Sequence, residues 1–151
     1  MDKIIGYTAG VFDLFHIGHL NLIKKAKQNC DYLIVGVNSD QLVQQYKNKT
    51  PVIPEEERLE IIKSLKYVDE AVLINTRDKL DAYKKYNFNK IFVGDDWKNH
   101  PSYNEAIDEL KPYGVEFIFF PYTKATSSTI IKKVLLDLYN KQEQIWKKKI
   151  Y

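Results

Sequence analysis

The sequence has little of several features that would place it in other protein classes. It contains one cysteine, Cys30, in 151 residues, so an intrachain disulfide framework is excluded and a buried thiol in a reducing compartment is expected. No run of about 18 apolar residues occurs, which excludes a transmembrane helix. The net charge of +3 is too small to indicate nucleic-acid binding by itself. The chain opens on an apolar segment without a signal-peptide pattern, so we expect a cytoplasmic protein without membrane or nucleic-acid partners.

The segments that are present alternate between strand-like and helix-like patterns. A hydrophobic content of 44% and a charged content of 28% are ordinary for one globular domain of this length. Residues 38–54 are polar, contain two prolines and are predicted as a loop. Strands are predicted over residues 3–8, 32–37, 71–74, 91–93 and 115–120, and helices over 18–29, 55–65, 78–86, 102–111 and from 128 onward.

This alternation predicts a single-domain α/β protein with a doubly wound, mostly parallel sheet of the Rossmann type. We assign the domain to residues 1–140 and treat residues 141–151 as a basic tail, a solvated end of the last helix. Ligands of such sheets bind at the carboxyl ends of the strands. Three loops with polar residues are expected at that rim, at residues 10–19, 94–97 and 126–129.

The most informative segment is His16-Ile17-Gly18-His19, which lies where the first strand hands over to a helix. Gly18 allows another group to approach the backbone closely. The first turn of the helix offers unpaired N–H groups and the positive end of the dipole, which together suit a phosphate. A zinc pair is the weaker interpretation, because no matching ligand cluster lies near the two histidines in sequence.

The other rim segments carry polar side chains that could bind phosphate but could also serve as helix caps or turn residues. Thr126-Ser127-Ser128-Thr129 precedes a helix, and four hydroxyl residues exceed what capping needs, which favours a polyphosphate held between two helix N-termini. Gly94-Asp95-Asp96-Trp97 fits a metal–phosphate complex, a ribose or a base edge, but also an ordinary turn. Lys47 and Lys49 lie in the long polar loop and Arg58 follows it, and a lysine on such a loop can close over a bound phosphate.

Four strings together resemble the nucleotidyltransferase superfamily marked by His-x-Gly-His. Within it they are most similar to the cytidylyltransferases, particularly the small bacterial glycerol-3-phosphate enzymes. The strings are residues 10–19, Lys66-Tyr67-Val68-Asp69-Glu70, Val93-Gly94-Asp95-Asp96-Trp97 and Thr126-Ser127-Ser128-Thr129, and they run in family order. The family often has arginine where Lys66 and Tyr122 stand here, and both arginines belong to nucleotide binding.

The resemblance implies a role for each matching position. Catalysis is implied for His16, His19 and Lys49, nucleotide binding for Gly10, Val11, Phe12, Gly18, Asp95, Asp96, Ser127, Ser128 and Thr129, and acceptor binding for Asp13, Lys47, Arg58 and Trp97. It also implies CTP and a small phosphomonoester as substrates, with Mg²⁺ held mainly by the CTP phosphates rather than by protein ligands. Family members are typically homodimers, with residues 67–70 near the interface.

Several alternatives stay open on the sequence. The same chemistry would serve phosphoethanolamine, phosphocholine or another polyol phosphate in place of glycerol-3-phosphate. Phosphocholine would favour an aromatic cage around its quaternary ammonium group. The chain has 11 tyrosines and two tryptophans, but the sequence does not show whether any of them form such a cage. ATP in place of CTP would make the protein an adenylyltransferase. A non-catalytic nucleotide-binding module is the hypothesis of a different class.

Overall fold

The computed structural model describes residues 2–121 and 127–150, and strands and helices alternate along them. The strands are β1 (Ile5–Gly10), β2 (Tyr32–Asn38), β3 (Glu70–Ile74), β4 (Lys90–Gly94) and β5 (Glu116–Phe120). The α-helices are α1 (Ile17–Gln28), α2 (Asp40–Lys47), α3 (Glu55–Lys63), α4 (Lys79–Tyr86), α5 (Pro101–Leu110) and α6 (Ser128–Ile150), and the short 3₁₀ helices are η1 (Asp95–Trp97) and η2 (Lys111–Tyr113).

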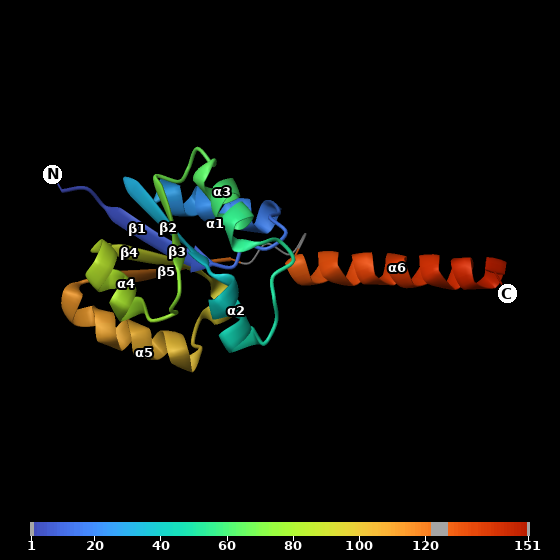
Figure 1. Ribbon diagram of the computed structural model, residues 1–151. Helices are drawn as coiled ribbons and strands as arrows, with labels where there is room; N and C mark the ends of the chain where they lie inside the picture. Colours follow the sequence, from blue (N-terminus) through green and yellow to red (C-terminus); the bar gives the residue numbers. More distant parts are fainter. Residues whose placement is uncertain (1, 122–126, 151) are drawn as a thin grey trace.

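The five strands form one parallel sheet in the order β3-β2-β1-β4-β5 (Figure 1). The chain runs outward from β1 through β2 to β3 and then crosses back to β4 and β5 on the other side of β1. The connections leaving β1 and β4 therefore diverge, and this leaves a crevice at the carboxyl ends of these two strands. The predicted doubly wound α/β fold is confirmed, and every pair of neighbouring strands in the described sheet is parallel.

Helices cover both faces of the sheet (Figure 1). On one face Ile23 of α1 and Ile62 of α3 pack against Leu33, Val35 and Val37 of β2. On the other face the aliphatic and aromatic side chains of α4 and α5, among them Leu110, pack with Tyr7, Ile34, Phe88, Ile91 and Val93. Because successive residues of β2 are buried on opposite faces, this strand is apolar almost throughout.

The predicted loop over residues 38–54 is wrong in its first half, where α2 forms. Ser39 is the N-cap, and its Oγ accepts a hydrogen bond from the N–H of Leu42 at 3.1 Å. Asp40 complements the dipole in the first turn, and the helix buries Leu42 and Val43. Asn48 then ends α2 in the left-handed region with φ +53°. Two buried residues within a polar segment are too weak a pattern to reveal so short a helix.

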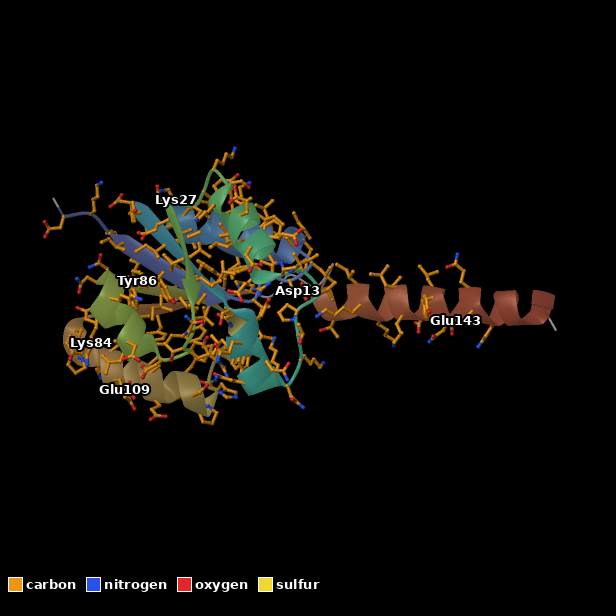
Figure 2. The ribbon with its side chains drawn as sticks, viewed as in Figure 1. Asp13, Lys27, Lys84, Tyr86, Glu109 and Glu143 are labelled. Atoms are coloured by element: carbon orange, nitrogen blue, oxygen red, sulfur yellow. The ribbon has the colours of Figure 1, made fainter. Side chains whose placement is uncertain are left out.

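Helix α6 leaves the sheet and projects away from the rest of the molecule (Figures 1 and 2). It runs without a break through residues 141–150, which the sequence sets apart as a basic tail. Figure 2 places Asp13 where α6 joins the domain and Glu143 far out along the helix. None of the helices within the described part of the chain is both long and apolar enough to cross a membrane.

Candidate active site

The turn between β1 and α1 has a strained backbone. Phe12 and Leu14 both adopt the left-handed region, with φ of +56° and +50°. Side chains of this size rarely occur there, and such a conformation costs of order 1–3 kcal/mol per residue. Burial of the Phe12 ring in the core offsets part of that cost. The two residues flank Asp13.

Asp13 connects three segments that form the rim of the sheet. Its carboxylate accepts hydrogen bonds from the N–H groups of Val52 and Ile53 at 2.8 and 2.9 Å and pairs with the Nζ of Lys132 at 3.0 Å. Its main-chain oxygen accepts a hydrogen bond from the hydroxyl of Ser128. Burial alone would raise the pKa of Asp13, but the two N–H donors and Lys132 outweigh it and lower the pKa. Asp13 therefore positions the 48–54 loop and α6, while its predicted contact with an acceptor stays a prediction.

The two histidines close the first turn of α1 with their own rings. The Nδ1 of His16 accepts a hydrogen bond from the N–H of Gly18 at 3.0 Å, and the Nδ1 of His19 accepts one from the N–H of His16 at 3.3 Å. The rings are stacked with centroids 3.9 Å apart. Because Nδ1 is an acceptor in both rings, each neutral imidazole carries its proton on Nε2. Both Nε2–H groups are then donors for an anion.

Both imidazoles are held in the neutral form. The pKa of His19 is lowered to about 4, chiefly by burial and also by the neighbouring His16, while Asp13 opposes the shift. Burial also lowers the pKa of His16. Neutral donors that are half-buried and fixed by hydrogen bonds before a ligand arrives stabilise negative charge without reorganising.

The low pKa of His19 predicts a pH dependence of stability. The unfolded chain takes up this proton near the ordinary pKa of 6.5, whereas the folded chain resists it until about 4. Protonation therefore favours the unfolded chain across that window, and the free energy of unfolding falls as the pH falls from 6.5 towards 4. Urea unfolding at a series of pH values measures this. The His19→Gln variant must flatten the dependence, and an equally steep profile in that variant would contradict the assignment.

The N-terminus of α6 faces the same crevice. The Oγ of Ser127 accepts a hydrogen bond from the N–H of Ile130 at 3.1 Å, which leaves its own O–H proton available to a ligand. Ser128 is engaged with Asp13, as described above. Helix capping by Ser127 and the hydrogen bond from Ser128 to Asp13 therefore account for two of the four hydroxyl residues at 126–129. Thr129 lines the crevice, and Thr126 lies outside the described residues.

Two adjoining cavities lie at the carboxyl ends of the strands. The histidine cavity, about 410 Å³, contains His16, Gly18, Asn21, Lys25 and Ser127. The lysine cavity, about 440 Å³, contains Gly10, Val11, Phe12, Asp13, Lys49 and Lys132. His19, Lys47, Trp97, Ser128 and Thr129 line both. Each volume is within the range of small-molecule sites, which run from about 300 to 1,000 Å³. Two ligands side by side, with shared residues between them, fit this arrangement.

The lysine cavity concentrates positive charge. Burial lowers the pKa of Lys47, and the charges of Lys132, Arg77 and Lys49 lower it further, while Asp13 opposes them. The part of this shift that comes from the neighbouring charges means that these cations repel one another in the absence of an anion. A phosphate bound among them relieves that repulsion.

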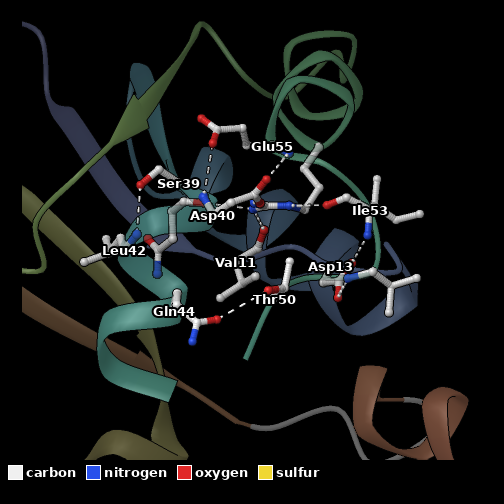
Figure 3. Close-up of polar contacts among 12 residues, drawn as sticks. Val11, Asp13, Ser39, Asp40, Leu42, Gln44, Thr50, Ile53 and Glu55 are labelled. Atoms are coloured by element: carbon white, nitrogen blue, oxygen red, sulfur yellow. Dashed lines mark hydrogen bonds and ion pairs between the residues drawn. The ribbon is translucent and has the colours of Figure 1, made fainter. Parts of the chain in front are cut away.

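Arg58 does not take the acceptor-binding role predicted for it. Its side chain is fully buried, and the guanidinium donates to the carbonyls of Ile53, Val11 and Asn38 and pairs with Asp40. Figure 3 shows these contacts between the β1–α1 turn, the start of α2 and the 48–54 loop. Each guanidinium nitrogen of Arg58 has a protein partner, and the residue lines neither cavity. Arg58 therefore stabilises the segments that form the site.

Of the remaining predicted positions, one lines the cavities and the others do not or lie outside the described residues. Trp97 of η1 lines both cavities, whereas Asp95 is exposed and lines neither. The side chain of Asp96 and the whole of Tyr122 lie outside the part of the chain that the structure describes. Lys66 lies away from both cavities, with its Nζ 5.2 Å from the centroid of the Tyr67 ring.

The family model described as cytidylyltransferase-like matches residues 7–134, from β1 into α6. The chain belongs to the cytidylyltransferase-like family. Among its relatives, the glycerol-3-phosphate cytidylyltransferase of Bacillus spizizenii is 37% identical over 91% of this chain and 100% of that protein. The FAD synthase of Thermococcus kodakarensis is 33% identical over 88% of this chain and 93% of that protein. The bifunctional protein HldE of Hyphomonas neptunium is 33% identical over 84% of this chain, but only 26% of that protein is covered.

Solved structures agree with the fold. The lipopolysaccharide core biosynthesis protein of Thermoplasma volcanium superposes with a TM-score of 0.68 and 26% identity, over 83% of this chain and all of that one. The pantoate-beta-alanine ligase of Francisella tularensis gives a TM-score of 0.60 at 18% identity, over 81% of this chain and 60% of that one, and shows the fold alone. Because the relatives differ in their named activities, family membership identifies a nucleotidyltransferase and leaves the substrates to be argued.

Three cationic residues of this cytidylyltransferase-like site were not predicted from the sequence. Arg77, Lys79 and Lys132 all line the lysine cavity. Arg77 follows β3, so its position at the carboxyl end of a strand was the one signal that the sequence offered. Lys132 is one helical turn after Ser128, on the face of α6 that meets Asp13.

The described residues offer no protein cage for a metal ion. No group of three or more histidine, cysteine, aspartate or glutamate side chains lies close enough within residues 2–121 and 127–150 to hold one. Asp13, the buried carboxylate of the site, already has three partners. Magnesium held through substrate phosphates and water, a common way for this ion to bind, stays a prediction.

Proposed function

We propose that this protein transfers CMP from CTP to glycerol-3-phosphate, giving CDP-glycerol and pyrophosphate. The observation that carries the proposal is the pair of adjoining cavities, one with neutral histidine donors and the other with lysines, which share His19 and Lys47. The similarity to the Bacillus spizizenii enzyme, which spans that whole protein, supports the choice of acceptor.

The reaction needs no strong general base. The attacking group is an oxygen of the acceptor phosphate, which is largely ionised at neutral pH because its second pKa is about 6. A bond forms from this oxygen to the α-phosphorus of CTP, and the bond from that phosphorus to the bridging oxygen breaks, so that pyrophosphate leaves. The difficulty lies in bringing two polyanions together, which makes positioning and electrostatic stabilisation the main contributions.

The arrangement of donors suits those two needs. The Nε2–H groups of His16 and His19 and the N-termini of α1 and α6 would stabilise charge on the phosphates of CTP. Lys47 lies on the wall shared by the cavities, where it would hold the acceptor phosphate against the α-phosphate. Mg²⁺, bound through the triphosphate oxygens, would neutralise part of the charge on the leaving pyrophosphate.

Pyrophosphate release is the direct test. The purified protein is incubated with CTP, Mg²⁺ and single phosphomonoesters, with ATP in parallel, because a relative is named FAD synthase. Release with CTP and glycerol-3-phosphate alone supports the proposal. Release with another acceptor or with ATP overturns the substrate and keeps the transfer chemistry. CTP binding without release from any pair favours the non-catalytic module.

We expect Lys49→Ala to lower kcat by about 10²-fold, because it removes a cation that stabilises charge at the reacting phosphates. Lys49 is exposed, so the free energy of unfolding should change by less than about 0.5 kcal/mol. Steady-state kinetics and urea unfolding measure the two effects. Lys63→Ala, on the exposed surface of α3 and outside both cavities, is the matched control. Equal kcat values in the two variants would make Lys49 a solvated surface charge.

A further inference from the structure

Arg77 lies against two aromatic rings at one wall of the lysine cavity. It belongs to the connection between β3 and α4, while the rings come from Tyr46 of α2 and Trp97 of η1. Its guanidinium carbon is 4.2 Å from the centroid of the Tyr46 ring and 5.7 Å from that of the Trp97 ring. Three segments that are distant in the sequence thus converge on a single cation.

Lys79 adds a second cation to the same wall. Its Nζ lies 5.8 Å from the centroid of the Tyr103 ring. The pKa of Lys79 is lowered to about 8, chiefly by burial and also by the charge of Arg77, while Asp78 opposes the shift. Neither Arg77 nor Lys79 forms an ion pair with a carboxylate of the residues that the structure describes. The wall is therefore aromatic in composition but positively charged at the surface it presents.

This combination decides which acceptors the cavity can favour. A quaternary ammonium group is recognised by open aromatic faces, and here the protein's own guanidinium covers two of them. A cationic acceptor would also meet the like charges of Arg77 and Lys79, and such juxtaposition is a strong means of rejecting a ligand. An acceptor that ends in hydroxyl groups meets no such repulsion and can accept hydrogen bonds from the guanidinium.

We propose that Arg77 is a specificity-determining residue, which covers the Tyr46 and Trp97 rings and so admits acceptors with a hydroxyl-rich end while rejecting those with a quaternary ammonium. This inference rests on the proposed function and narrows its acceptor class. It assigns the selection to one side chain of the β3–α4 connection rather than to the residues around the histidines.

The test compares glycerol-3-phosphate with phosphocholine. Pyrophosphate release gives kcat/KM for each acceptor, and calorimetric titration gives the affinity of each in the absence of turnover. For the unmodified protein we expect glycerol-3-phosphate to be favoured by at least about 100-fold. In Arg77→Gln, which removes the charge and uncovers the rings, the ratio should shift towards phosphocholine by at least about tenfold. Arg77→Lys, which keeps the charge, should retain most of the preference.

Lys85→Gln is the matched control, because Lys85 lies 6.0 Å from the ring centroid of Tyr86 and lines neither cavity. It should leave the ratio unchanged. Equal preference for the two acceptors in the unmodified protein, or an unchanged ratio in a folded Arg77→Gln variant, would overturn the inference while the transfer reaction stood. If no acceptor gave turnover, the proposed function would fail, and the ratio of the calorimetric affinities would still decide the role of Arg77. Thermal unfolding of each variant establishes that it is folded.

Discussion

We expect the His16→Asn and His19→Gln variants to release pyrophosphate about 10²–10³-fold more slowly than the unmodified protein, which is the effect of removing one preorganised donor from a site of developing charge. Both rings offer an Nε2–H to the histidine cavity, because the backbone already donates to each Nδ1. Simple replacement by alanine would confuse two effects, since the same rings cap α1. Asparagine is a good N-cap and glutamine completes a capping box, so these variants keep the helix end.

The matched control for these variants is His100→Asn. His100 is the N-cap of α5, where its Nδ1 accepts a hydrogen bond from the N–H of Ser102 at 3.3 Å, and it lines neither the histidine nor the lysine cavity. It undergoes the same chemical change at a helix end, and we expect kcat within about twofold of the unmodified protein. Steady-state kinetics and circular dichroism measure both properties. Folded His16 and His19 variants with unchanged kcat would remove the histidines from the mechanism.

The sequence was sufficient for the fold because its apolar segments have the lengths and spacing of a parallel sheet covered on both sides. β2 is apolar at successive positions because Leu33 and Ile34 are buried on opposite faces. The strand ends then locate the rim, and most of the predicted site residues do line the two cavities. A rule about sheet topology placed the rim loops, since it needs only the order of the elements, and the resemblance to the family supplied the individual residues.

The roles of individual polar side chains were harder to predict, since they depend on which partner is closest in space. Asp13, Arg58 and Ser128 have the composition of a ligand-binding set, yet each is committed to a protein contact that joins segments far apart in the sequence. Arg77 shows the opposite case. It follows a strand in an ordinary polar loop, and only the folded structure brings Tyr46 and Trp97 against it.

Arg58→Met is expected to lower the free energy of unfolding by about 3–5 kcal/mol, because each buried carbonyl left without its donor costs about 1–3 kcal/mol. The side chain of Arg58 has no exposed surface, and its loss leaves the carbonyls of Val11 and Asn38 without their donor. For a domain of this size the melting temperature should fall by about 10 °C. Urea and thermal unfolding measure the two quantities.

Asp40→Asn is the informative comparison, because it weakens the same ion pair from its outer end. The Asp40 side chain is 33% exposed, so solvent screens that charge, and the three guanidinium bonds to carbonyl groups persist. We expect a loss of about 1 kcal/mol or less. Equal losses in the two variants would show that the ion pair dominates the contribution of Arg58. A loss below about 1 kcal/mol in Arg58→Met would contradict its role as the brace that holds the β1–α1 turn against the 48–54 loop.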